Sequence, residues 1–272
     1  TNCFLSMINF FRKIRKKLAD DNQFFKYARY AIGEVVLVVV GILIALQINN
    51  WNENRQIQNQ VNLQLKNLKT AIQSDIESHD RVLGMEGFRF HAIRYILETA
   101  GETVRLYHYQ YDEFPNQPRV LWNKPIPEGW DRAYFEACFS AIDLSTVGSF
   151  INDKAIIEFG NSGLFSALYN PELKSIINEY YLNAEMWFSG ALWDNNLEIT
   201  MKTKDLLENQ HQIDLRRMSD VEDPIRLIRE NKLIIIRLHT LLDKVSLTCE
   251  TLVNSRKRAE QVILAIDQEL EQ

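Results

Sequence analysis

The chain has 272 residues, which suits one or two domains, and 46% of them are hydrophobic while 25% are charged. Its net charge of −5 argues against a nucleic-acid partner, because proteins that bind nucleic acids usually present a basic surface. Only 10 glycines and 6 prolines occur, which favours helices over an all-β fold. We therefore expect a mainly α protein.

A basic leader, residues 1–29, opens the chain. Between Met7 and Leu18, apolar residues recur at helical spacing and alternate with Lys and Arg, which predicts a basic amphipathic helix lying on an anionic membrane surface. Docking to a cytoplasmic partner is the alternative. Residues 1–6 stand outside this pattern, and Met7 is a candidate natural start.

Residues 30–48 form an apolar run of about 19 residues, or roughly 28 Å of helix, which is long enough to cross a bilayer. No small-x-small cleavage site follows, so we expect an uncleaved signal anchor rather than a signal peptide. Lys and Arg are concentrated before the run. The positive-inside rule therefore predicts a cytoplasmic N-terminus, with residues 49–272 on the other side of the membrane.

Several residues are predicted to fix this span in the membrane. Tyr30 and Trp51 match the aromatic belts at the two interfaces. Glu34 is interpreted as a carboxylate that reaches the interface, with an ion site or a partner contact as the alternative. Gly41 and Ala45 form a small-xxx-small pair that allows close helix contact. The predicted membrane anchor comprises Tyr30, Gly33, Glu34, Gly41, Ala45 and Trp51.

Two long helices are predicted beyond the membrane. A stalk helix, 51–100, has apolar residues at three- and four-residue spacing, with Gly84 and Gly87 expected to interrupt it. A C-terminal helix, 224–270, carries a heptad seam. We favour an intramolecular antiparallel hairpin of the two helices, and a self-associating coiled coil is the alternative. The seam comprises Ile234, Leu238, Leu241, Val245, Thr248, Leu252, Ser255, Ala259, Val262 and Ile266.

The segment between these helices begins with an aromatic, proline-rich loop, 101–130, with one short strand or hairpin at 104–111. Its aromatic residues are candidates for binding a peptide or glycan, although capping the end of the bundle is the favoured interpretation. They are Tyr107, Tyr109, Tyr111, Trp122 and Trp130. Further helices are expected over 131–207, and Asn170 followed by Pro171 is a strong start signal for one of them.

The leader and span resemble a bacterial single-span family of unknown function. The resemblance rests on MINFFRKIRKKL at 7–18, YARYAIGE at 27–34 and VGILIALQINNWNE at 40–53. A looser similarity covers SGL at 162–164, NPEL at 170–173 and YY at 180–181. The resemblance implies a Gram-negative inner-membrane address and a helical exported region, and it implies no activity.

No common catalytic, nucleotide-binding or metal-binding motif is present in the sequence. The pairs Asp75/His79 and Glu208/His211 have helical spacing that a metal could use, but ordinary surface polar contacts are the favoured interpretation. We therefore predict no catalytic, cofactor or metal residues. Cys138 and Cys249 form either one disulfide or two buried thiols, and the thiols are favoured.

Three functions remain open for this sequence. The leading hypothesis is a membrane-anchored periplasmic helical module that binds or scaffolds a partner, either another copy of the chain or a different envelope protein. A periplasmic small-ligand sensor working through a partner is the second hypothesis. A membrane-tethered envelope hydrolase is the third, and it would require a pocket that gathers His79 or His211 with carboxylates.

Overall fold

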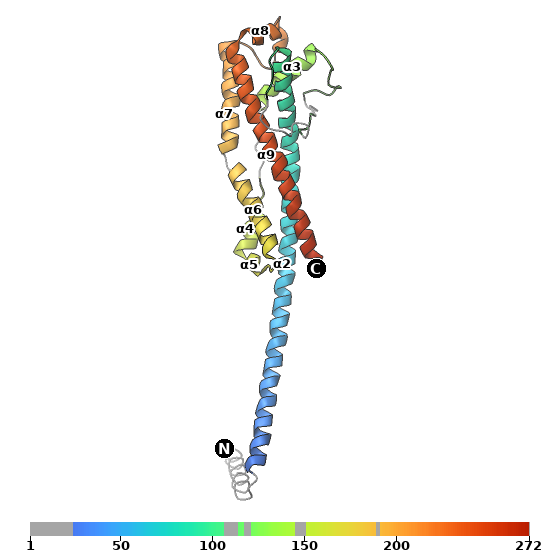
Figure 1. Cartoon of the computed structure of the whole chain (residues 1–272), viewed down its shortest axis with the longest axis vertical. Helices are drawn as coiled ribbons and strands as arrows, with labels where there is room; N and C mark the ends of the chain where they lie inside the picture. Colours follow the sequence, from blue (N-terminus) through green and yellow to red (C-terminus); the bar gives the residue numbers. More distant parts are fainter. Residues whose placement is uncertain (1–23, 106–113, 117–120, 145–150, 189–190, 272) are drawn as a thin grey trace, which may run out of the picture. The chain divides into compact units, whose positions relative to one another are not determined.

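A computed structural model describes residues 24–105, 114–116, 121–144, 151–188 and 191–271 (Figure 1). The described residues are mainly α-helical and include no strand, which confirms the predicted fold class. The chain divides into two compact units, residues 1–60 and 61–272. The predicted strand or hairpin at 104–111 falls largely outside the described residues.

Helix α2, Phe24–Thr99, begins in the first unit and contributes to both. Within the first unit, the large apolar side chains from Val35 to Ile48 are all exposed, by 44–74%. By length and composition, α2 is the one helix in the described part of the chain that could cross a membrane. An apolar surface on every side of a helix is unfavourable in water and is typical of segments that lie in an apolar environment.

The second unit is a helical bundle built from the later part of α2, α6 (Pro171–Phe188), α7 (Ala191–Asp205) and α9 (Lys232–Leu270). Helices α2 and α9 are antiparallel, because Lys69 contacts Asp267 at 2.5 Å whereas Asp80 contacts Arg256 at 3.1 Å. Helices α6 and α7 pack in succession along α9 (Figure 1).

The heptad seam of α9 is buried inside this bundle. Eight of its ten residues are buried, and Thr248 and Ser255 are half-buried. Near the C-terminal end of α9, Val262 and Ile266 share a core with Leu65 and Leu68 of α2. A larger core surrounds the N-terminal half of α9 and includes Leu238. The seam is therefore covered within the chain, as expected of a helical hairpin; self-association remains an untested prediction.

Short elements complete the second unit. They are α3 (Arg132–Ser140), the 3-10 turns η2 (Ala141–Asp143) and η4 (Met218–Asp220), α4 (Lys154–Asn161), α5 (Leu164–Ala167), the π-helical turn η3 (Leu206–Gln210) and α8 (Pro224–Glu230). The N-cap prediction for α6 is confirmed, since Asn170 Oδ1 accepts hydrogen bonds from the backbone N–H groups of Glu172 and Leu173, both at 3.0 Å.

Two predictions about helix continuity were wrong. Gly84 and Gly87 do not interrupt α2; instead, a Cβ atom at Gly87 would lie 2.5 Å from the carbonyl oxygen of Pro115, so this glycine allows the loop to approach the helix. The predicted single helix 224–270 is broken at Asn231. The Asn231 side chain accepts hydrogen bonds from the backbone N–H groups of Leu233 and Ile234, and so caps a new helix.

The favoured prediction of two buried thiols at Cys138 and Cys249 is confirmed, and they form no disulfide. Both residues are buried free thiols in the larger core, where they pack as small apolar side chains. Burial raises the pKa of Cys138 to about 12, so this thiol stays protonated and unreactive at neutral pH.

Candidate functional site: a pocket between α6 and α9

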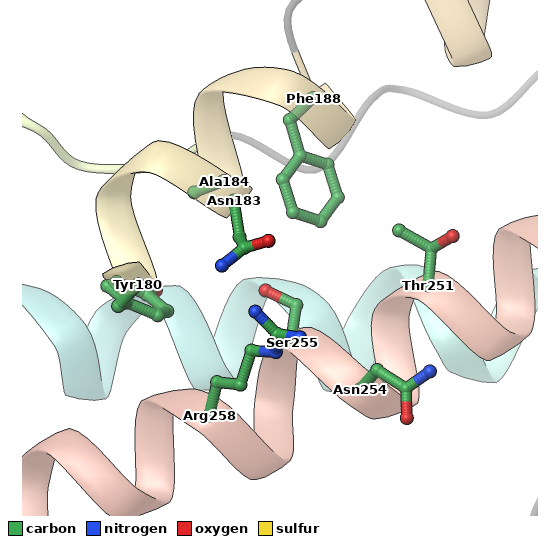
Figure 2. Close-up of a pocket in the computed structure, with 8 residues that line it drawn as sticks. All are labelled: Tyr180, Asn183, Ala184, Phe188, Thr251, Asn254, Ser255 and Arg258. Atoms are coloured by element: carbon green, nitrogen blue, oxygen red, sulfur yellow. The ribbon is translucent and has the colours of Figure 1, made fainter. Parts of the chain in front are cut away.

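A small pocket opens between α6 and α9 in the second unit (Figure 2). Its volume is about 50 Å³, which is room for a few water molecules. Residues from two helices line it: Tyr180, Asn183, Ala184 and Phe188 from α6, and Thr251, Asn254, Ser255 and Arg258 from α9. The pocket therefore has an aromatic side and a polar side that includes one cation.

The polar groups of the pocket converge. Figure 2 shows Asn183 directed from α6 toward Ser255 and Arg258 on α9. The amide nitrogen of Asn183 donates to the carbonyl oxygen of Glu179 at 2.7 Å, which leaves the amide oxygen available to the pocket. Arg258 Nη1 is shielded from solvent and lies 3.5 Å from Glu179 Oε1, but it makes no hydrogen bond to the described residues.

His79 on α2 lies behind the pocket and supports its wall. Its Nε2 is 2.8 Å from Ser255 Oγ, and its ring lies 5.2 Å from that of Phe188. The side chain is fully buried, and desolvation lowers its pKa from 6.5 to about 4. His79 is therefore neutral at physiological pH and fixes two pocket residues in place.

Asp75 lies one turn earlier on α2 and is also buried. Its carboxylate accepts hydrogen bonds from the Tyr180 hydroxyl at 2.9 Å and from the Asn152 backbone N–H at 2.8 Å. Burial nevertheless raises the pKa of Asp75 to about 6, since desolvation outweighs the two hydrogen bonds. Burial and the neighbouring Asp75 likewise raise the pKa of Tyr180.

The predicted surface role of Asp75 and His79 was therefore wrong. Each faces the bundle interior, and their polar atoms contact Tyr180, Asn152 and Ser255. No group of three or more His, Cys, Asp or Glu side chains with metal-binding geometry occurs among the described residues.

The second predicted pair, Glu208/His211, does not share one α-helical face. Glu208 lies in the π-helical turn η3, 3.9 Å from Lys204, and His211 follows that turn. A nitrogen of the His211 ring lies 2.9 Å from the side-chain nitrogen of Asn231.

The Ser255–His79 contact has the distance expected of a nucleophile and its general base. Its electrostatics do not suit that role, because a general base works best with a pKa near the working pH and that of His79 is about 4. Ser255 also lies in the middle of the 39-residue helix α9. The pair is better suited to holding the pocket wall than to activating a hydroxyl.

A second buried polar cluster joins four elements within the larger core. Arg89 of α2 donates to the carbonyl oxygen of Ile142 at 3.0 Å and to Thr200 Oγ1 at 2.5 Å, and it lies 3.6 Å from Glu86. Asn196 links this cluster to Thr248 on α9 at 3.1 Å. Because Glu86, Arg89, Asn196 and Thr200 are all buried, the cluster is a structural element of the bundle rather than a ligand site.

The sequence-predicted site residues lie apart from this pocket. The predicted anchor residues are spread along the exposed part of α2, and Arg55 stacks on Trp51 with its guanidinium 5.8 Å from the ring centre. Tyr107, Tyr109 and Tyr111 fall outside the described residues. Trp122 packs edge-to-face on Tyr134, with ring centres 5.2 Å apart, and donates to the carbonyl oxygen of Pro125 at 3.1 Å.

Trp130 also packs on α3, with its ring centre 5.0 Å from that of Phe135, and it remains half-exposed. These contacts fit a loop that caps the bundle.

The pocket itself was missed, because its residues are separated by about 70 positions in the sequence and have no recognisable spacing. The signals available were polar residues on otherwise apolar helix faces, namely His79 on α2 and Ser255 on α9.

Comparison with known proteins adds one finding. Residues 34–98, most of α2, match a family described only as a family of unknown function (DUF6090). This agrees with the resemblance to an uncharacterised family, although the basic leader lies outside the matched residues. Searches of curated proteins and of solved structures found no match.

Proposed function

We propose that this chain is a membrane-anchored module that presents a helical bundle outside the cytoplasm and acts by binding rather than by catalysis. The single observation that carries the proposal is the apolar segment of α2, whose side chains from Val35 to Ile48 are exposed all round the helix. Hydrocarbon satisfies such a surface, and water does not. The concentration of Lys and Arg before the segment supports a cytoplasmic N-terminus.

The same orientation supports a bacterial inner-membrane address with the bundle in the periplasm. The resemblance of the leader and span to a bacterial single-span family supports the same address. In that setting the lipid bilayer is the first partner of the chain. Two-dimensional confinement also raises the effective concentration of any second membrane protein, or of a second copy, around the bundle.

The outer surface of α6 and α7 supports partner binding. Leu182 and Met186 on α6, and Leu197 and Met201 on α7, are 48–69% exposed, and we call these four residues the outer row. Single exposed apolar residues are ordinary, whereas two large ones one helical turn apart on each of two consecutive helices favour a contact surface. Methionine suits such surfaces because its side chain adapts to different partners.

In-cell photo-cross-linking tests this proposal. A photoreactive residue is placed at Met186 or Met201, with Gln261 on the exposed side of α9 as the matched control position. We expect adducts with one defined envelope protein, or with a second copy, from the outer row alone. Equal adduct patterns from the outer row and from Gln261, or adducts from neither, would contradict partner binding.

The pocket between α6 and α9 favours a second candidate function, a small-ligand sensor that works through a partner. Its polar groups line a small, partly open pocket, and His79 holds Ser255 from behind, as expected of a preformed site. The hydrolase hypothesis is less well supported, because the buried His79 is a poor base and the carboxylate of Asp75 is occupied by Tyr180 and Asn152.

A further inference from the structure

We propose that the pocket between α6 and α9 is a binding site for a small carboxylate of about two to four carbons, with Arg258 as the residue that binds its charged end. The inference rests on the sensor function proposed above and specifies its ligand class.

The charge of the pocket selects an anion. Arg258 is the cation among the eight lining residues, and its side chain is 41% exposed. Its Nη1 is shielded from solvent, lies 3.5 Å from Glu179 Oε1 and makes no hydrogen bond to the described residues. A carboxylate forms strong, often bidentate hydrogen bonds with a guanidinium, so a ligand carboxylate can supply the hydrogen bond that the Glu179 contact does not.

The remaining lining groups select the body of the ligand. Ser255 and Asn183 lie beside the guanidinium in Figure 2 and can orient a second polar group. Phe188 and Ala184 provide an apolar side for a short carbon chain. A volume of about 50 Å³ holds only a few non-hydrogen atoms, so the part of a ligand that enters the pocket must be small, as the end of a short carboxylate is.

Glu179 is the internal competitor for this site. Its carboxylate lies 3.5 Å from Arg258 Nη1 on the exposed surface of α6, where an ion pair is weak and easily exchanged. A ligand carboxylate displaces or shares this contact. Removing the charge of Glu179 should therefore tighten ligand binding, which is the opposite of the effect expected at a residue that contacts the ligand directly.

The test uses the full chain in a neutral detergent, titrated with sodium propionate and followed by thermal unfolding and by ligand-observed NMR. Propionamide, which has nearly the same shape and no charge, is the ligand control, and sodium chloride controls for ionic strength. We expect stabilisation by propionate that neither control reproduces, because a ligand that binds only the folded state raises the unfolding temperature.

Four variants locate the effect. Arg258→Gln should weaken propionate binding by at least about tenfold, and Glu179→Gln should tighten it by about two- to fivefold. Ala184→Met should abolish binding by filling the cavity without altering a polar group. Arg226→Gln is the matched control, because Arg226 is an exposed arginine on α8 paired with Glu230 and should leave binding unchanged.

The possible failures are distinguishable. Binding of propionate and propionamide with equal affinity, lost in Ala184→Met, would overturn the carboxylate assignment and leave the pocket as a ligand site. Binding of neither compound would overturn both the assignment and the sensor function. Propionate binding that persists in Arg258→Gln would place the anion elsewhere and also overturn the inference.

Discussion

Two stretches of the same helix, α2, have opposite relations to their surroundings. Residues 35–48 are apolar around the whole helix and every large side chain is exposed. Residues 61–81 alternate between buried apolar positions, such as Leu65 and Ile72, and mostly polar exposed ones, and residues 82–97 are buried or half-buried throughout. The first stretch shows no face that would pack on another part of the protein, whereas the second shows one.

The difference indicates that one continuous helix is suited to two solvents. A helix apolar on all sides is stable in hydrocarbon, and an amphipathic helix is stable where one face is covered by protein. The amphipathic stretch also carries buried polar residues, including Asp75, His79, Glu86 and Arg89, whereas residues 35–48 contain no charged residue. Substitutions of these residues test the difference between the two stretches most directly.

The largest effect is expected at the buried ion pair. Arg89→Met removes a buried cation that pairs with Glu86 and donates to Ile142 and Thr200, and it should cost about 3–5 kcal/mol of unfolding free energy. The matched control is Arg94→Met on the exposed Arg94–Glu98 pair of the same helix, which should cost less than about 1 kcal/mol. Urea unfolding followed by circular dichroism measures both, and equal costs would contradict the assignment of Arg89 as a buried structural residue.

The next largest effect concerns insertion into the membrane. Leu43→Arg places a charge near the centre of the apolar stretch and should oppose insertion by about 3 kcal/mol. Leu63→Arg is the control, because Leu63 is equally exposed but lies beyond the apolar stretch. We expect Leu43→Arg to shift the chain from the carbonate-resistant membrane pellet to the soluble fraction, and Leu63→Arg to remain in the pellet.

The buried polar residues predict a pH dependence made of two opposing parts. The lowered pKa of His79, about 4 against 6.5, means that the unfolded chain binds more protons between these values, so stability rises with pH. The raised pKa of Asp75, about 6 against 3.8, means that the folded chain binds more protons, so stability falls as pH rises. Over pH 4–6.5 the two contributions largely cancel.

Single substitutions separate these contributions. Relative to the wild type, Asp75→Asn should lose about 2 kcal/mol of stability between pH 7 and pH 4.5, because only the histidine contribution remains. His79→Gln should change in the opposite direction by a similar amount. Urea midpoints at the two pH values test this, and shifts of the same sign in both variants would show that the two residues do not titrate as described.

The smallest effects are expected at the two glycines of α2. Gly84→Ala should stabilise the bundle by about 0.5–1 kcal/mol, since a Cβ there meets nothing within 4 Å and alanine favours the helix. Gly87→Ala should instead destabilise by about 1 kcal/mol or more, because its Cβ would lie 2.5 Å from the Pro115 carbonyl oxygen. Thermal unfolding compares them, and stabilisation by both would mean that the loop does not pack on Gly87.

The sequence predicted features that depend on local pattern. The apolar run of α2, the heptad positions of α9 and the Asn170 cap of α6 each follow from spacing or from one residue type at a helix start. The break at Asn231 was missed because the spacing of apolar residues continues across it. Only the hydrogen bonds that the Asn231 side chain accepts from the backbone show that one helix ends and another begins there.

Features that depend on contacts between distant segments were not predictable. Asp75 and His79 were expected on the surface because polar residues usually lie there, and only the packing of Tyr180 and Ser255 against them explains their burial. The pocket requires α6 and α9 to be placed side by side, which no local pattern specifies. In the sequence, nothing distinguishes Arg258 from an ordinary surface arginine.

The central claim, a membrane-anchored bundle outside the cytoplasm, is tested most directly by cysteine labelling in cells. Cys138 and Cys249 are buried, so Gln261→Cys adds an exposed thiol to the bundle, and Asp20→Cys in the leader serves as the opposite reporter. We predict that a membrane-impermeant maleimide labels position 261 in intact spheroplasts and labels position 20 only after permeabilisation. Labelling of position 20 but not of position 261 in intact spheroplasts would contradict the account.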